Sequence, residues 1–408
     1  MQRRFGFVLV LALLLAVFAP VSAQDTTTIR YFTFSAAPDY LEELDQIVQA
    51  FQAENPGIVI EVATAPFSDY FTLLQADVVS GDAPDVFELN FENFVTYAAN
   101  DTLLDISQYL SGEAPYYPRA LEAFQYNGVQ LALPETFSTV LLFYNADLFD
   151  AAGIGYPEAD WTWEDAAVAG EAIAALGDDV WGLYSSVHFW EFYKKAAQQG
   201  ACEFFNAEMT ESTINSEGCV EALETMISFM DRGIMPTQAQ LSGISDSELF
   251  ISGKVGMLVT GIWMFGAFQD VDFTWDVQIE PAMNQKAHHF FANGVAVSAT
   301  TANAEAAAKW AEFLTASEVA ATVRVESSWE LPALDAPEYF EAYLQQTPPA
   351  NRAAVFQALE SPVTPPVIER QNEMQDAINA LISRVLDGEL TAQAALDEAK
   401  TILDGLIQ

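Results

Sequence analysis

Carboxylates are the most abundant groups in this chain that could do chemistry. The sequence holds 58 Asp and Glu residues but only 3 His and 2 Cys. A glycoside hydrolase needs two carboxyl groups about 5–10 Å apart, and spacing along a sequence does not establish such a distance. A secreted glycoside hydrolase therefore stays open as a weaker alternative, with no particular carboxylate expected to be catalytic.

Histidine and cysteine form no recognisable catalytic or metal-binding pattern. His288 and His289 are adjacent, and neighbouring side chains on a strand point to opposite faces, so the pair is not expected to share a metal ion. The sequence has no H-E-x-x-H, C-x-x-C, Walker, Rossmann or G-x-S-x-G motif. We expect no enzyme activity, no metal and no cofactor. Cys202 and Cys219 could form a disulfide in an exported protein or stay as two buried thiols.

The charge balance excludes two classes of partner. Lys and Arg total only 15, so the formal net charge is −43. Nucleic-acid phosphates are neutralised by Lys and Arg, and an anionic membrane surface repels negative charge. We therefore expect no nucleic-acid partner and a monomer that its acidic surface keeps in solution.

The first residues have the pattern of a secretory leader. Arg3 and Arg4 precede an apolar run over residues 5–18, and small residues follow at 21–23. We predict a signal peptide over residues 1–23, cleaved after Ala23. The run is too short for a comfortable membrane span, and no later run approaches 18 apolar residues, so the mature chain is expected to have no span. No Cys lies near the predicted cleavage site, so we expect no lipid anchor there.

The first part of the mature chain alternates between strand and helix patterns. Short apolar runs at 28–34, 58–62 and 85–89 read as strands, and helical spacing of Leu44, Val48 and Phe51 predicts a helix between the first two. This order predicts a parallel sheet covered by helices on both faces. Ligands then bind beyond the carboxyl ends of the strands, near residues 34–36 and 90–92.

A second α/β region follows. Residues 131–144, 254–260 and 294–298 contain apolar runs typical of strands. Thr162, followed three residues later by Asp165, predicts a helix start with a capping box, and Thr391 is expected to cap a final amphipathic helix. Because no repeat and no low-complexity linker is present, two lobes joined by strands are expected rather than two tethered domains.

Several segments, in order, resemble one family. They are AFQAENPGIVIEV (50–62), SGDAPDVFELN (80–90), LLDISQYL (103–110), NGVQLALPETFSTVLLFYNADLFDAAGI (127–154), WTWEDA (161–166), FISGKVGMLVTGIWMFGAF (250–268), NGVAVSATTANAEAAAKWAEFLTASE (293–318) and GELTAQAALDEAKTIL (388–403). Together they span nearly the whole mature chain. Their order resembles extracellular solute-binding protein family 1, the sugar-binding proteins of ABC importers similar to maltose-binding protein.

The resemblance implies an α/β, two-lobed periplasmic-binding-protein type II fold with a hinge of crossing strands and an inter-lobe cleft. It implies lobe 1 over 24–137 plus 289–332 and lobe 2 over 138–288 plus 333–408. It further implies a periplasmic or extracellular protein that closes over a neutral sugar, leaves it unaltered and delivers it to the membrane permease of an ABC importer. That permease would also hold the protein at the cell surface.

The same resemblance implies a set of ligand contacts, carried over position by position. They are Phe34, Ser35, Asn90, Phe91, Glu92, Phe137, Ser138, Trp190, Trp263, Asn293, Gly294, Trp329 and Glu330. His188 occupies a matching position but is expected at the rim. The family's polar grip after the first strand is weakened here, because Ala36 and Ala37 stand at that tip.

The residue types suit a sugar, because aromatic rings cover the C–H faces of a pyranose while amides and carboxylates bind its hydroxyls. A second hypothesis keeps the fold but changes the ligand to a polyamine or another organic cation. Glu92, Asp39 and Glu330 would then pair with the amines, and Trp or Phe would add cation–π contacts.

Overall fold

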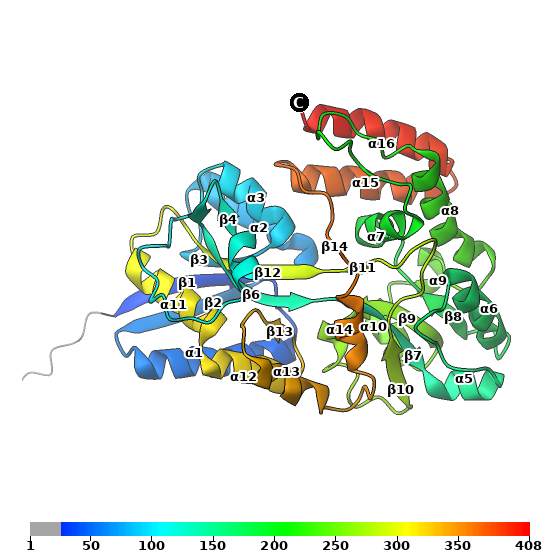
Figure 1. Cartoon of the computed structure of the whole chain (residues 1–408), viewed down its shortest axis with the longest axis horizontal. Coiled ribbons are helices and arrows are strands. Elements are labelled where there is room, and N and C mark those ends of the chain that lie inside the picture. The colour runs from blue at the N-terminus through cyan, green and yellow to red at the C-terminus, as the bar shows by residue number, and fades with distance from the viewer. Residues whose placement is uncertain (1–25) are drawn as a thin grey trace, which may run out of the picture.

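The structure, a computed structural model, describes residues 26–408, so the predicted signal peptide lies outside the described residues. The chain forms two α/β lobes, at the left and right of Figure 1. The first lobe is built on a six-stranded sheet of order β13-β6-β12-β3-β1-β2, and the second on a four-stranded sheet of order β10-β7-β9-β8. The expected two-lobed fold is confirmed.

The first lobe collects segments that are distant in the sequence. It consists of β1 (Thr27–Thr33), α1 (Pro38–Glu54), β2 (Ile58–Thr64), α2 (Phe67–Ser80), β3 (Val86–Asn90), α3 (Phe91–Ala99), α4 (Pro118–Ala123), β4 (Gln125–Tyr126), β5 (Val129–Gln130), β6 (Ala132–Ser138), β12 (Phe291–Val297), α11 (Ala304–Ala316), α12 (Glu318–Ser327) and β13 (Leu331–Pro332). The three strands expected early in the chain pair in parallel, as predicted. β6, β12 and β13 extend the sheet with antiparallel pairings.

The second lobe follows the first crossing of the chain. It consists of β7 (Val140–Asn145), α5 (Ala146–Ala152), α6 (Trp163–Ala174), β8 (Trp181–Tyr184), α7 (Phe189–Gln199), α8 (Glu217–Asp231), α9 (Gln238–Leu241), α10 (Asp246–Ile251), β9 (Val255–Gly261), the 3-10 helix η1 (Ile262–Met264), β10 (Trp275–Gln278), α14 (Ala353–Ala358), α15 (Gln371–Leu386) and α16 (Ala392–Leu406). The predicted capping box of Thr162 and Asp165 opens α6, and Thr391 caps α16.

The chain crosses between the lobes three times, the last time between α13 (Pro337–Leu344) and α14, and two extended crossing segments lie in the middle of Figure 1. One runs from β6 through Thr139 into β7, and the other from β11 (His288–His289) into β12. β11 also pairs with β14 (Pro362–Val363), while α13 packs on α12. The Thr139 hydroxyl donates to the His289 carbonyl at 2.6 Å, so the two crossings are bonded to each other where they leave the first lobe.

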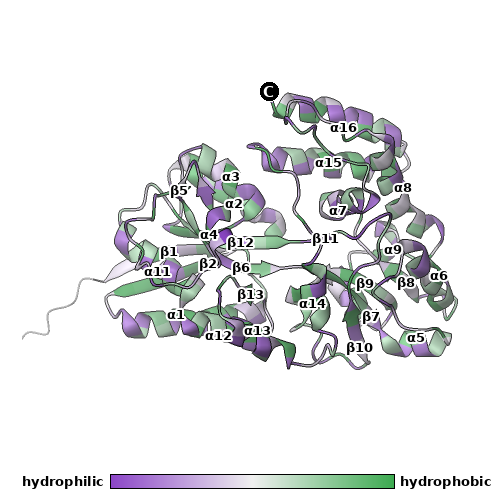
Figure 2. Ribbon diagram, viewed as in Figure 1, coloured by the Kyte–Doolittle hydropathy of each residue, from purple (hydrophilic) through white to green (hydrophobic). Residues whose placement is uncertain are grey.

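Alternating side chains give the first sheet a core on each face. Ile29 and Tyr31 of β1 join a cluster with Trp310 of α11, whereas Phe32 joins a second cluster with Phe87 and Phe94. This alternation follows from the two-residue period of a strand. Figure 2 shows the result, with hydrophobic central strands and helices that carry hydrophilic stripes. Over residues 26–408, no helix combines the length and apolar character that a membrane crossing requires.

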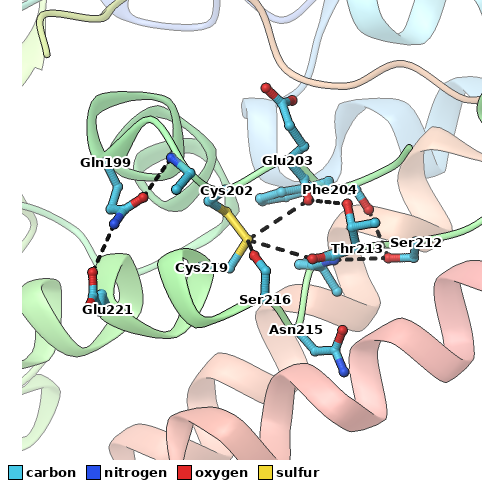
Figure 3. Close-up of a disulfide and its surroundings, with 12 residues drawn as sticks. Gln199, Cys202, Glu203, Phe204, Ser212, Thr213, Asn215, Ser216, Cys219 and Glu221 are labelled. Atoms are coloured by element: carbon cyan, nitrogen blue, oxygen red, sulfur yellow. Dashed lines mark hydrogen bonds between the residues drawn. A yellow bond between two sulfur atoms is a disulfide. The ribbon is translucent and has the colours of Figure 1, made fainter. Parts of the chain in front are cut away.

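A disulfide joins Cys202 to Cys219 in the outer part of the second lobe (Figure 3). Both residues lie in an apolar cluster formed with α7, α8, α15 and α16. Gly218 permits the close approach of the two segments, because a Cβ there would lie 2.5 Å from the Ala201 carbonyl oxygen. The bridge therefore ties the loop before α8 to the first turn of that helix.

Candidate functional site

A cavity of about 680 Å³ lies between the lobes. Seven aromatic side chains contribute to its wall: Phe34, Tyr40, Phe67, Trp190, Trp263, Phe291 and Trp329. Among the described residues, the lining includes no Lys or Arg. The cavity is thus suited to a ligand with apolar faces rather than to an anion.

The first lobe contributes the segments that follow its parallel strands. Phe34 and Ser35 come directly after β1, and the Ser35 amide donates to the Thr33 hydroxyl at 3.0 Å. Asn90 ends β3 and caps α3, because its Oδ1 accepts the Asn93 amide at 3.2 Å. Tyr40 lies in the first turn of α1. Helix starts at the carboxyl edge of the sheet therefore place these side chains in the wall.

The second lobe contributes the start of α7 and the turn after β9. His188 precedes α7 and Trp190 lies in its first turn. Trp263 belongs to η1, and its ring lies so close to Gly261 that a Cβ at that glycine would be 2.1 Å away. The glycine therefore permits the indole to fold back over the end of β9. Asp246, from the start of α10, also lines the cavity.

Glu330 lines the cavity where the crossing strands meet the first lobe. It accepts hydrogen bonds from the Thr136 hydroxyl and from Asn293 Nδ2, the latter at 3.3 Å. Burial raises the pKa of Glu330, and the Thr136 bond offsets part of that rise. The carboxyl therefore has its hydrogen-bond partners within the protein but no direct ion pair.

Two further carboxyls lie buried behind Glu330. Glu135 forms an ion pair with Arg324, and Glu88 accepts a hydrogen bond from Thr33. Burial raises the pKa of Glu135 despite Arg324, and burial together with Glu135 raises the pKa of Glu88 well above its usual range. We call Glu88, Glu135, Glu330 and Arg324 the acidic cluster. Arg324 is the only basic member of the cluster, and its direct partner is Glu135.

A second polar group lies beneath the cavity in the other lobe, and we call it the lysine cluster. Its members are Glu191, Tyr193, Lys194, Lys195, Glu280 and His289. Lys194 contacts Glu191 at 2.6 Å and also pairs with Glu280, while Lys195 is 3.3 Å from Glu191. Burial opposes ionisation of Glu191, but Lys194 and Lys195 outweigh it and hold the pKa well below its usual range.

Histidine completes the lysine cluster at the cavity surface. His289 Nε2 lies 3.1 Å from Glu191 Oε1, and its Nδ1 lies 2.6 Å from the Tyr193 hydroxyl. Burial lowers the pKa of His289 to about 3, with Lys194 adding to the effect. The imidazole is therefore neutral at physiological pH. It accepts one bond and donates the other, and joins Glu191 to Tyr193.

Nine of the thirteen predicted contact residues line the cavity. They are Phe34, Ser35, Asn90, Ser138, Trp190, Trp263, Asn293, Trp329 and Glu330. His188, expected at the rim, also lines it. Trp329 is only 4% exposed, because its ring lies between Tyr40, stacked at 4.6 Å, and the Arg324 guanidinium at 4.4 Å.

The other four predicted residues lie outside the cavity wall. Phe91 packs against Phe124, and a Cβ at Gly294 would lie 2.6 Å from the same Phe124 ring. Phe137 faces Phe290 and Phe340. Glu92 is 1% exposed, lies in the first turn of α3 and is not part of the cavity lining.

Several wall residues did not figure in the sequence prediction. Tyr40 and Phe67 begin the helices that follow the first two strands, so the rule that directed attention to strand ends would have found them. Phe291 could have been found from its place beside Asn293 on the predicted crossing strand. His289 gave no such signal, because its partners Glu191 and Tyr193 are 98 and 96 residues away in the sequence.

The lobes touch each other on both sides of the cavity. On one side, the Tyr40 hydroxyl donates to the backbone carbonyl of Trp263. On the other, Phe67 packs edge-to-face on Trp190 at 6.3 Å, and the Thr96 hydroxyl donates to the Glu369 carbonyl at 2.8 Å. The structure is therefore a closed arrangement of the two lobes.

Residues 37–321 match the profile of the family described as bacterial extracellular solute-binding protein. A solved ABC substrate-binding protein from Listeria monocytogenes, in complex with cycloalternan, is 43% identical with a TM-score of 0.90, and the match covers 93% of this chain and 99% of that one. In Bacillus subtilis (strain 168), a galactooligosaccharide-binding protein is 24% identical, with 88% and 86% covered, and a maltodextrin-binding protein is 22% identical, with 92% and 89% covered.

Proposed function

This chain belongs to the family of bacterial extracellular solute-binding proteins, and from that premise we propose that it captures an oligosaccharide between its lobes and delivers it to the permease of an ABC importer. The observation that carries the proposal is the inter-lobe cavity with seven aromatic side chains and no Lys or Arg among the described lining residues. Aromatic faces pack on the C–H faces of pyranose rings, and amides and carboxyls at the rim bind hydroxyls.

The magnitudes are sufficient for tight binding. A Kd of about 1 μM needs about 8 kcal/mol net. Hydrogen bonds contribute roughly 1 kcal/mol each, and aromatic contacts about 0.5–1.5 kcal/mol beyond the area they bury. Several of each converge on this cavity. We propose as ligand contacts the nine predicted residues that line it, together with Phe67 and Phe291.

The state of the lining carboxyls favours a neutral sugar over an organic cation. Glu191 already has two lysine partners, and the raised pKa of Glu330 disfavours a negative charge there because of burial. Glu92, expected to pair with an amine, is buried outside the wall. Asp246 is the remaining carboxyl of the lining. A polyamine would therefore meet one such group rather than the three carboxyls that the cation hypothesis named. We propose cycloalternan as the first ligand to test, since it occupies the 43% identical Listeria monocytogenes protein.

Further parts of the proposal concern the whole chain. We propose that it is exported through its leader, acts as a monomer outside the cytoplasmic membrane and releases its sugar unaltered. We also propose the predicted lobe boundaries, at 137/138, 288/289 and 332/333, as the hinge. The change of sheet between β6 and β7 and the bond between Thr139 and His289 support the first two.

Isothermal titration calorimetry tests the proposal. The ligands are cycloalternan, maltotriose and galactooligosaccharides, with spermidine and putrescine as the cationic alternative. We expect a Kd of about 1 μM or tighter for at least one sugar, and no heat from the amines. Trp263→Ala should weaken sugar binding at least tenfold, whereas Trp161→Ala, outside the cavity, should not. No sugar binding, or release of reducing sugar by the purified protein, would contradict the proposal.

A further inference from the structure

Tyr40 belongs to the first lobe but makes contacts that concern both lobes. It lies in the first turn of α1, and its ring stacks on Trp329 with the centroids 4.6 Å apart and the planes 7° apart. Its hydroxyl donates to the backbone carbonyl of Trp263 in the second lobe. One side chain therefore contacts two of the cavity's tryptophans, one on each side of the cleft.

Both tryptophans depend on these contacts for their position. The Arg324 guanidinium lies 4.4 Å from the Trp329 ring, so Arg324 and Tyr40 hold that indole in place together. The Trp263 indole folds back against Gly261, where a Cβ would lie only 2.1 Å from the ring. This packing against Gly261 holds the indole close to its own backbone. A hydrogen bond to the Trp263 carbonyl therefore also helps to hold the ring relative to the first lobe.

A second contact adjoins the Tyr40 bond across the same rim. A Cβ at Gly266, just after η1, would lie 3.4 Å from the Ser327 carbonyl oxygen and 3.9 Å from Asp39 Oδ2. The second lobe thus approaches α1 and the end of α12 closely at this point. An opening of the lobes at this rim would separate these groups and break the Tyr40 bond.

We propose that Tyr40 is a positioning residue that couples the two tryptophans across the lobes and selectively stabilises the closed state. The inference rests on lobe closure as part of the proposed function. An interaction that exists only in the closed state shifts the equilibrium toward that state and slows ligand release. The stack of Tyr40 on Trp329 lies within the first lobe, so opening of the lobes does not break it. Of the two Tyr40 contacts, the hydrogen bond to the Trp263 carbonyl is the one that depends on closure.

Tyr40→Phe isolates that bond, because it keeps the ring and removes only the hydroxyl. A typical protein hydrogen bond corresponds to a factor of roughly ten in an equilibrium constant. We therefore expect the ratio of closed to open molecules to fall about tenfold. We expect cycloalternan to dissociate about tenfold faster, with an unchanged association rate.

The matched control is Tyr116→Phe. It also removes a tyrosine hydroxyl bond, at 2.6 Å to Thr315, but within the first lobe. That variant is expected to change neither the closed-to-open ratio nor the dissociation rate. A purely structural loss of a hydroxyl would affect both variants alike.

Single-molecule fluorescence energy transfer between the lobes measures the ratio of closed to open molecules without a ligand. Dyes are attached at V79C in α2 and V168C in α6, two positions that are 81% and 56% exposed. The native cysteines are joined to each other and do not compete for dye. Equal closed-to-open ratios in wild type and Tyr40→Phe would overturn the proposal, whereas a drop confined to Tyr40→Phe would support it.

Stopped-flow measurements with cycloalternan supply the second readout. Failure of the wild-type protein to bind this or any other sugar would count against the proposed function alone. The energy-transfer comparison would still decide the role of Tyr40, since it needs no ligand.

Discussion

Each lobe has a buried polar cluster beside the cavity. The two clusters differ in how the charge of their buried carboxyls is compensated. In the acidic cluster three carboxyls lie near one guanidinium, which pairs directly with Glu135, and burial raises the pKa of Glu88, Glu135 and Glu330. In the lysine cluster two carboxyls face two ammonium groups, and the lysines lower the pKa of Glu191, although burial still raises the pKa of Glu280. The first lobe thus favours uptake of protons, while the second forms ion pairs.

The difference shows how a strongly acidic chain can present a neutral cavity. A buried charge is costly unless it is paired or neutralised. The first lobe reduces its charge through raised carboxyl pKa values, and the second through Lys194 and Lys195. Either route lowers the charge that these two clusters bring to the cavity wall, which agrees with an uncharged ligand.

The largest effect is expected from the removal of a lysine from the lysine cluster. Lys194→Ala would leave Glu280 without its closest partner, and would leave Glu191 with Lys195, His289 and the Ser185 hydroxyl. Breaking a buried ion pair leaves an uncompensated charge, so we expect a loss of about 3–5 kcal/mol in the free energy of unfolding. Urea denaturation followed by circular dichroism measures it.

The control is Lys254→Ala, whose partner Asp179 is exposed. We expect no measurable change in that variant, because water screens such pairs. Similar losses in both variants would contradict the importance of burial in the lysine cluster.

The second lobe also differs by its disulfide, which the first lobe lacks among the described residues. Replacing both Cys202 and Cys219 by Ser opens a loop with a sequence separation of 17. The chain-entropy relation predicts a loss of about 3 kcal/mol, seen as a lower thermal midpoint. Sugar affinity should not change, because neither cysteine lines the cavity. A weakened affinity with an intact fold would show that the bridge influences the site.

Much of this arrangement follows from local sequence patterns. The spacing of Leu44, Val48 and Phe51 predicts α1, whose buried face they form. Strand ends predict Phe34 and Asn90 in the cavity wall, because the carboxyl edge of a parallel sheet is fixed by topology. These features depend on residues that are close in the sequence.

The polar clusters could not be predicted in the same way. Lys194 and Lys195 lie in an amphipathic helix and read as a solvated surface pair, yet both are fully buried. Their partner Glu280 is more than 80 residues away, and only the packing of α7 beneath the crossing strands brings it close. The burial of Glu92 could not be predicted for a related reason, since α3 packs on α15, which comes from the far end of the chain.

Glu92 tests the pH behaviour of the first lobe. Burial raises its pKa to about 8, and neither carboxylate oxygen has a hydrogen-bond partner among the described residues. Between about pH 4.5 and 8 the native state therefore holds a proton that the unfolded state has lost, so this group makes the free energy of unfolding fall as pH rises. Glu92→Gln should remove a slope of up to about 1.4 kcal/mol per pH unit.

Urea denaturation at pH 5 and pH 8 measures that slope in wild type and variant. The variant should gain stability relative to wild type at pH 8 and match it more closely at pH 5. Parallel pH profiles would show that Glu92 is ionised in the native state, and the contrast between the lobes would then not extend to this residue.

The smallest effect is expected from Glu88→Gln, which tests directly whether the buried carboxyl of the first lobe is neutral. A carboxyl held neutral by burial and by Glu135 resembles an amide, and Gln keeps an acceptor for the Thr33 hydroxyl. We therefore expect a loss below about 1 kcal/mol in the free energy of unfolding at pH 7. The matched change in the other lobe, Glu191→Gln, removes a charge that two lysines require and should cost roughly 3 kcal/mol. Equal losses would mean that Glu88 is ionised like Glu191, because only an ionised carboxylate loses charge on becoming an amide, and the two lobes would then balance their buried charge by the same means.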